Sequence, residues 1–326
     1  MSVDPRQIYE DELAKWRAEK GEKGEKPRTQ FEPMELDSLM NGETEEISWL
    51  IEDVWPMGRQ IHIHAQRKSG KSLLMLWVAC CLAIGRDPFT AEPRIPQVVG
   101  YWDPEMARED IRERLEDMGF RPIPPLLIQN LHYYLLQPIP PLDTEAGGQA
   151  LLRQAQAMNE TAVILDTLSR FIAGDENASE TYINFYRYTG QPLKAANISL
   201  TRTDHEGWEA GRSRGSSAKA DDVDIVWQLK PTDDGIELTR KFTRVSYVPE
   251  FVALVKREEP NLHFTRAVMA WPAGTKEKAL ELDELLVPVE VGRNLAIKAL
   301  KAAGRTVGKT NVLTAAIKWR KLRALP

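Results

Sequence analysis

The feature that most constrains this chain is the segment of residues 59–76, RQIHIHAQRKSGKSLLML. Its first part alternates apolar residues at Ile61, Ile63 and Ala65, the pattern of a buried strand. Residues 66–69 predict a tight loop, and the residues from Lys71 onward have the periodicity of an amphipathic helix. A strand, a short loop and a helix in this order are the local structure that can bind a phosphate at the helix N-terminus.

The end of the loop, Ser69-Gly70-Lys71-Ser72, matches the second half of the pattern G-x-x-x-x-G-K-[ST]. In this pattern backbone N–H groups cradle the β-phosphate, the lysine reaches the β- and γ-phosphate oxygens, and the hydroxyl binds Mg²⁺. We therefore expect a bound nucleotide with Mg²⁺, Lys71 on the phosphates and Ser72 on the metal. The expected nucleotide-binding residues are Ala65, Gln66, Arg67, Lys68, Ser69, Gly70, Lys71, Ser72 and Leu73.

Ala65 stands where the pattern has its first glycine. The change adds only a methyl group, but an alanine is strained if that position needs a positive φ. This departure puts the affinity for the nucleotide in doubt more than the mode of binding.

Composition narrows the class of protein. The chain has 326 residues and 42% hydrophobic content, enough for one large or two modest domains with a real core. Its two cysteines, Cys80 and Cys81, are adjacent on the predicted helix, where side chains point about 100° apart, so we expect no disulfide and a reduced, cytoplasmic setting. An export signal and an apolar run of about 18 residues are both missing from the sequence, so we expect no membrane partner.

Two acidic side chains follow predicted strands. Residues 161–166, TAVILD, form an apolar run that ends on Asp166, as in a buried parallel strand that delivers a carboxylate to the sheet edge. Such runs are common, and the upstream Lys71 loop is what favours a role for Asp166 in holding Mg²⁺, usually through water. Residues 97–102 predict another strand, and Glu105 lies just beyond its C-terminal end, where open α/β sheets place their ligand chemistry.

The C-terminal part of the chain has a different charge. Net charge is −5 overall, yet residues 291–326 carry nine Lys or Arg residues and no acid. Short helices are predicted at 276–286, 293–303 and 309–322, and the last two resemble a helix-turn-helix or winged-helix unit. The candidate nucleic-acid contacts are Lys318, Arg320, Lys321 and Arg323; the alternative is a basic helix that packs on its own core and shows its charge to solvent.

These patterns divide the chain into an N-terminal arm and linker (1–46), an ATPase-like domain (47–249) and a helical, basic C-terminal domain (250–326). Within the middle part, residues 223–229 and 236–243 predict a hairpin at the edge of the sheet. Residues 206–222, EGWEAGRSRGSSAKADD, form a long polar loop with three glycines, and such loops are usually functional or disordered.

Four blocks, in this order, resemble the RecA-like AAA ATPases of plasmids and phages, specifically the RepA-type hexameric replicative helicases. The blocks are AQRKSGKSLL, GYWDPEMAREDIRERL, VILDTLSRFIAGDENAS and TDHEGWEAGRSRGSSAKADDVDIVWQL. The resemblance covers about residues 49–229. It implies an α/β fold: a RecA-like P-loop NTPase core with a largely parallel sheet flanked by helices, and ATP with Mg²⁺ as cofactors.

The resemblance also implies a role for each matching residue. Glu105 would polarise the attacking water, and Asp166 would be the Walker B acid. His205 would sense the γ-phosphate, although a histidine near a strand end is as often structural. Arg214 would be the finger that reaches the nucleotide of an adjacent subunit, with Arg212, two residues away, as the alternative.

We therefore expect an ATP-hydrolysing DNA motor that acts in phage or plasmid replication or recombination. Its partners would be single-stranded or forked DNA and further copies of itself in a ring, expected to be a hexamer. The alternative is a nucleotide-gated DNA-binding protein, loader or recombination mediator that does not unwind DNA processively. A metabolite kinase is a third class, because a phosphate loop does not name the acceptor.

Overall fold

The structure is a computed structural model that describes residues 15, 34, 36, 40, 47–120, 128–205, 222–267, 272, 274–308 and 310–323. The chain divides into two compact units, Met1–Glu46 and Ile47–Pro326. In the first unit the described Lys15, Leu36 and Met40 are helical.

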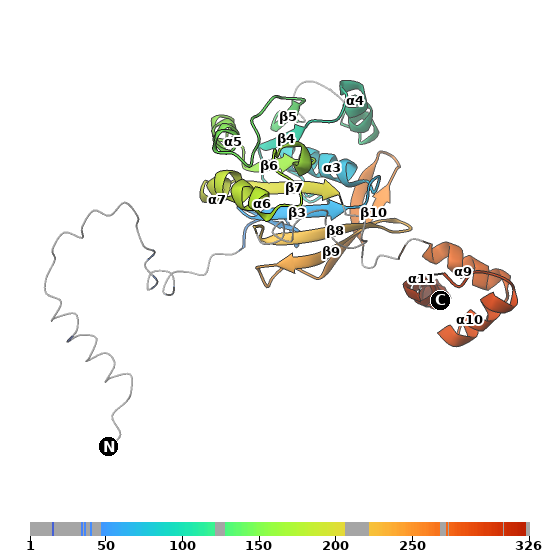
Figure 1. Cartoon of the computed structure of the whole chain (residues 1–326). Helices are drawn as coiled ribbons and strands as arrows, with labels where there is room; N and C mark the ends of the chain where they lie inside the picture. Colours follow the sequence, from blue (N-terminus) through green and yellow to red (C-terminus); the bar gives the residue numbers. More distant parts are fainter. Residues whose placement is uncertain are drawn as a thin grey trace, which may run out of the picture. The chain divides into compact units, whose positions relative to one another are not determined.

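A nine-stranded sheet forms the centre of the second unit, in the order β11-β10-β9-β8-β3-β7-β6-β4-β5 (Figure 1). The six strands from β8 to β5 are parallel to one another, and β9, β10 and β11 extend the sheet as antiparallel strands. The strands are β3 (Gln60–Ala65), β4 (Val99–Asp103), β5 (Leu131–Leu135), β6 (Ala162–Leu165), β7 (Ser199–His205), β8 (Ile225–Pro231), β9 (Gly235–Thr243), β10 (Phe251–Arg257) and β11 (His263–Ala267). A separate small sheet pairs β1 (Trp49–Ile51) with β2 (Trp55–Pro56).

Helices bury both faces of the parallel strands, which is why the sequences of these strands are almost continuous apolar runs. Along β6, Ala162 and Ile164 join the core cluster that contains α3 (Lys71–Ala83), whereas Val163 and Leu165 join the cluster on the opposite face. That second cluster takes side chains from α5 (Glu145–Ala157), α6 (Ser179–Phe185) and α7 (Gln191–Ala195). The remaining short elements are α4 (Arg108–Asp117), the 3₁₀-helix η1 (Leu168–Arg170) and the π-helix η2 (Tyr186–Gly190).

The strand order confirms the predicted fold class. The phosphate-loop strand β3 is central, and one strand, β7, separates it from β6, whose end carries Asp166. Because β3, β4, β6 and β7 are parallel, their carboxyl ends meet at one edge of the sheet. This is a RecA-like α/β fold with a mostly parallel sheet and flanking helices.

The antiparallel edge of the sheet extends further than the sequence predicts. The expected hairpin is present as β8 and β9. The helical region expected from residue 250 is wrong for residues 251–267, because β10 pairs with β9 and β11 pairs with β10. Val252 and Leu254 of β10 and Phe264 of β11 pack into the main core, so the burial of these apolar side chains joins the segment to the sheet.

Three helices follow, close to the predicted positions: α9 (Thr275–Glu284), α10 (Arg293–Ala302) and α11 (Thr310–Arg323). They enclose a small core of their own, formed by Leu282, Val287, Ala296, Leu300, Leu313 and Ile317. Residues 274–308 and 310–323, as the structure describes them, contain helices and no strand that could serve as a wing. In the described part of the chain, none of the helices combines the length and the hydropathy needed to cross a membrane.

The β8–β9 turn holds the first turn of α9. Asp233 accepts hydrogen bonds from the backbone N–H of Gly274 (Oδ1, 2.6 Å) and of Lys276 (Oδ2, 2.7 Å). A carboxylate at this position satisfies two of the N–H groups that a helix start leaves without partners and interacts favourably with the helix dipole. The neighbouring Asp234 instead pairs with the exposed Lys276 ammonium.

Replacing Asp233 with alanine should loosen the start of α9. A lost side-chain acceptor at a helix N-terminus costs about 1 kcal/mol, which is about a fivefold change in a local opening equilibrium. We expect the amides of residues 275–278 to exchange hydrogen about fivefold faster in Asp233→Ala, measured by mass spectrometry. Asp234→Ala is the matched control, since it removes a carboxylate one residue away that pairs only with a side chain at this helix; equal acceleration in both variants would contradict the role given to Asp233.

Candidate functional site

The loop after β3 adopts the backbone that a phosphate cradle needs. Ala65 is the last residue of β3 and pairs with His205 on one side and Leu229 on the other, so its backbone is extended and its methyl group is not strained. Positive φ angles occur instead at Lys68 (61°) and at Gly70 (85°). A Cβ at Gly70 would meet no atom closer than 3.9 Å, so it is the left-handed conformation, and not lack of space, that favours glycine there.

This loop lines a cavity of 370 Å³ at the N-terminus of α3. Two polar atoms there, Ser69 Oγ and His205 Nδ1, are buried and have no hydrogen-bond partner among the residues that the structure describes. Buried polar atoms normally have partners, so a ligand with acceptor and donor atoms fits this space. The lining residues are Gln66, Lys68, Ser69, Gly70, Lys71, Ser72, Leu73, Arg114 and His205, which include seven of the nine predicted nucleotide-binding residues.

Lys71 is the buried cation of the site. Its side chain is 5% exposed, and its Nζ lies 3.4 Å from Thr167 Oγ1 and 3.8 Å from Asp166 Oδ1. Burial lowers the pKa of Lys71, and the charges of Asp166, Asp204 and Glu105 act in the opposite direction. Three carboxylates around one ammonium keep a positive charge where phosphate oxygens would lie.

Asp166 is fixed by hydroxyl groups from two neighbouring strands. Tyr101 on β4 donates to Oδ2 (2.7 Å), and Thr203 on β7 donates to Oδ1 (2.5 Å). These bonds hold the carboxylate at the edge of the sheet where Lys71 and Ser72 begin α3. Within the described residues no three His, Cys, Asp or Glu side chains group as a preformed metal site. The Ser72 hydroxyl and the Asp166 carboxylate are oxygen ligands of the kind that could hold a Mg²⁺ together with phosphate oxygens and water.

A second cavity of 420 Å³ adjoins the first, because His205 lines both. The other residues that line it are Arg67, Glu105, Ser169, Arg170, Glu176 and Asp204. Glu105 enters from the end of β4, where Asp103 Oδ1 accepts hydrogen bonds from the backbone N–H of Glu105 (2.8 Å) and Met106 (3.0 Å) and so shapes the turn. Its own carboxylate accepts a hydrogen bond from Arg170 Nε (2.7 Å).

The pKa of His205 is lowered, mainly by burial, which favours the neutral imidazole. Burial lowers the pKa of His205 most, Lys71 and Arg67 lower it further, and Asp204 and Glu105 oppose them. A neutral imidazole at the junction of the two cavities can donate a hydrogen bond to a phosphate oxygen without adding another full charge.

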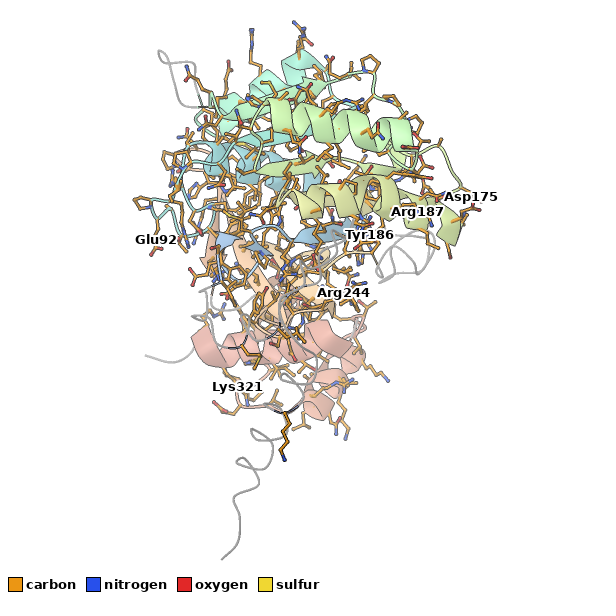
Figure 2. All side chains as sticks on the ribbon, turned by 90° about the vertical axis from the view of Figure 1, so that its left-hand side faces the viewer. Glu92, Asp175, Tyr186, Arg187, Arg244 and Lys321 are labelled. Atoms are coloured by element: carbon orange, nitrogen blue, oxygen red, sulfur yellow. The ribbon has the colours of Figure 1, made fainter. Side chains whose placement is uncertain are left out.

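The four predicted nucleic-acid residues lie on α11 and are not equivalent. Arg320 is 2% exposed; it donates to Asp283 Oδ1 (2.7 Å) and to the carbonyl of Val287, so in this structure it stabilises the helical core. Arg323 pairs with the same Asp283 (2.5 Å), and Lys321 lies 3.6 Å from Glu290. Lys318 is exposed. Figure 2 shows Lys321 extending away from the helices. Arg212 and Arg214, the two candidate fingers, lie outside the described residues.

Sequence reasoning misses the position of three cations that line the cavities. Arg114 belongs to α4, whose many charges suggest only a solvated face, and Arg170 follows Asp166 by four residues in a segment without periodicity. Arg67, predicted as part of the phosphate loop, lines the second cavity instead of the first. Only the fold, in which parallel strands bring separate segments together, places Arg67, Arg114 and Arg170 on these two cavities.

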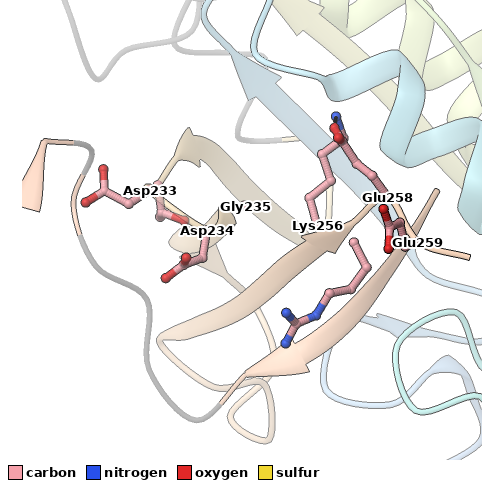
Figure 3. Close-up of a pocket in the computed structure, with 8 residues that line it drawn as sticks. Asp233, Asp234, Gly235, Lys256, Glu258 and Glu259 are labelled. Atoms are coloured by element: carbon pink, nitrogen blue, oxygen red, sulfur yellow. Dashed lines mark hydrogen bonds and ion pairs between the residues drawn. The ribbon is translucent and has the colours of Figure 1, made fainter. Parts of the chain in front are cut away.

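A third cavity, of 650 Å³, shares no lining residue with the other two. It lies between the β8–β9 turn and the end of β10, with Asp233 and Asp234 on one side and Lys256, Glu258 and Glu259 on the other (Figure 3). Both signs of charge line it, and Lys256 pairs with Glu258 (2.8 Å). None of the predicted site residues contributes to it.

The lowered pKa of His205 predicts a pH dependence of stability. Between the ordinary histidine pKa near 6.5 and the lower folded value, the unfolded chain binds a proton that the folded chain does not, so the free energy of unfolding falls as the pH falls through this window. Urea unfolding of the wild type and of His205→Gln, from about pH 7.5 downward, should show a steeper decline for the wild type. Parallel curves would contradict the effect of burial.

Comparison with known proteins agrees with this geometry. The AAA domain family matches residues 25–211, more than half of the chain. No curated protein matches it. Among solved structures, the flagellar accessory protein FlaH from Methanocaldococcus jannaschii is 14% identical, with 66% of this chain and 91% of FlaH covered and a TM-score of 0.44. A KaiC-like protein from Pyrococcus horikoshii is 11% identical, with 67% and 93% covered and a TM-score of 0.47. At this distance the two structures say nothing about activity. The phosphate loop, the carboxylates beside it and the family match together show that this chain belongs to the AAA domain family of P-loop ATPases.

Proposed function

We propose that this protein hydrolyses ATP and uses the energy to move DNA. The observation that carries the first part is the convergence of Lys71, Glu105 and His205 on two adjoining cavities, with Asp166 held 3.8 Å from the Lys71 ammonium. The first cavity has the loop and cation for the phosphates, and the second has a carboxylate that can take up the attacking water. A phosphate-binding module alone would not need the second cavity.

The residues divide the work between charge and orientation. Lys71 and, from α4, Arg114 attract the phosphate oxygens. Ser72 and Asp166 would hold the Mg²⁺, which would supply further positive charge there. Glu105 accepts a hydrogen bond from the attacking water, and His205 contacts the γ-phosphate. In phosphoryl transfer, positioning and electrostatic stabilisation supply most of the catalysis, which matches a site made of fixed charges.

Two features support DNA as the partner. The four sequence blocks occur in the order found in RepA-type replicative helicases of phages and plasmids, which implies a hexameric ring, an Arg214 finger acting between subunits and single-stranded or forked DNA in the channel. The segment after β11 is basic, and Lys318 on α11 is exposed. A nucleotide-gated DNA-binding or loader protein uses the same features without unwinding. The internal pairing of Arg320 and Arg323 with Asp283 leaves less charge on α11 for DNA in either function.

Glu105→Gln should separate binding from hydrolysis. The neutral amide cannot accept the water proton, so we expect kcat for ATP to fall by about 10²-fold or more while the affinity for a fluorescent ATP analogue changes less than about threefold. Lys71→Ala should lose both ATP hydrolysis and affinity for the ATP analogue. Glu109→Gln, an exposed position on α4, is the matched control and should keep wild-type turnover. Intact ATP turnover in Lys71→Ala would overturn the proposal at its root.

DNA should raise the rate of ATP turnover, and the two exposed lysines of α11 should contribute to the affinity for DNA. We expect single-stranded DNA to raise ATP turnover, and a forked duplex to be opened; stimulation without opening would favour the loader.

Lys318→Ala with Lys321→Ala should lower the slope of log affinity against log salt by about 0.7 for each phosphate that the two lysines neutralise in the wild type. Lys256→Ala with Arg257→Ala, on β10, is the charge-matched control. A slope that the α11 variant leaves unchanged would assign these lysines to packing.

A further inference from the structure

Arg170 connects two parts of the site that are far apart in sequence. It is the last residue of η1, four residues after Asp166, and its Nε donates to Oε1 of Glu105 at the end of β4 (2.7 Å). Both side chains line the second cavity, beside His205. The hydrogen bond and the charge of Glu105 raise the pKa of Arg170, so the guanidinium keeps its charge.

The contact has little to offer stability. The Arg170 side chain is 63% exposed and that of Glu105 is 44% exposed, and ion pairs of this exposure contribute little to the free energy of folding. A glutamate has three side-chain torsions, however, and an exposed one samples several rotamers. The planar guanidinium restricts this freedom, because its hydrogen bond fixes the direction from which Oε1 is contacted.

The segment that carries Arg170 begins beside Lys71, the lysine of the phosphate loop. Its first residues, Asp166 and Thr167, are the ones that approach Lys71 (3.8 and 3.4 Å). Leu168, in the middle, is fully buried in the core cluster on the α5 side of the sheet. One stretch of five residues therefore touches the phosphate lysine at one end and the water-polarising carboxylate at the other, with a buried leucine as its support.

We propose that Arg170 is a positioning residue for hydrolysis, which acts through Glu105 by holding its carboxylate in the orientation that accepts the attacking water. The inference rests on the proposed function, since it assumes that Glu105 polarises that water. It adds that the geometry of Glu105 is set by the segment that also holds the metal-binding Asp166. Arg170 makes no contribution of its own to the phosphates. Small errors of orientation in such sites lower the reaction rate by up to about 10²-fold. Loss of this exposed ion pair should therefore affect the rate far more than the stability of the fold.

A double-mutant cycle tests whether Arg170 acts through Glu105. The variants are Arg170→Ala, Arg170→Lys, Glu105→Gln and Arg170→Ala combined with Glu105→Gln. ATP hydrolysis is measured in single-turnover reactions with excess enzyme, followed for hours so that slow rates are resolved. Affinity is measured with a fluorescent ATP analogue, and thermal melting checks folding.

For Arg170→Ala we expect a rate about 10- to 100-fold below wild type, with an unchanged affinity for the nucleotide. Arg170→Lys, which keeps the charge but not the planar fork, should recover part of the rate. In the Glu105→Gln background, Arg170→Ala should cost less than about twofold, because the group that it positions is already disabled. Arg112→Ala, an exposed arginine on α4, should behave as the wild type.

Three outcomes would overturn the inference. An equal loss of rate in both backgrounds would mean that Arg170 acts on the phosphates independently of Glu105. A parallel loss of affinity would make it a binding residue. A wild-type rate in Arg170→Ala would leave it no role in turnover. The proposed function fails separately: it falls if the wild type does not hydrolyse ATP or if Glu105→Gln is fully active.

Discussion

The whole site depends on the burial of Lys71 among carboxylates. An ammonium with 5% exposure is costly unless opposite charges surround it, and Asp166, Asp204 and Glu105 supply these charges from three parallel strands or the turns after them. The parallel sheet makes this possible, because it brings the carboxyl ends of β3, β4, β6 and β7 to one edge. If Lys71 is removed, the negative charges of these carboxylates face one another without a cation between them. In the wild type, a phosphate group must compete with the same carboxylates for the Lys71 ammonium.

The sequence predicts the parts of this site that are local. Residues 66–73 form the cradle because a strand, a left-handed Gly70 and a helix start follow one another directly, and Asp166 is predictable because a fully buried strand ends there. Ala65 raises a doubt that only the structure removes, since the position is the extended end of β3. The roles implied by the family resemblance for Glu105 and His205 fall on residues that line the cavities.

Contacts between distant segments could not be predicted. Arg170 and Glu105 are 65 positions apart, and nothing in either segment indicates that η1 points toward the end of β4. The same limit explains the tail: composition counts nine cations in residues 291–326, but not that Arg320 turns inward to Asp283, which precedes that window. It explains β10 as well, because a short apolar segment next to a helical region shows no sign of being a strand until its pairing partner, β9, is known from the fold.

In the proposed function, hydrolysis needs more than the phosphate loop. A loop on β3 and α3 fixes only the phosphates, whereas the attacking water must be held on the far side of the γ-phosphate by a different strand. Glu105 is suited to this because Asp103, two residues earlier, anchors the backbone at the end of β4 while the Glu105 carboxylate itself stays partly exposed. An exposed carboxylate on a rigid backbone needs its orientation fixed from outside its own strand. The side chain found at that position is Arg170, and it comes from the same segment that carries Asp166.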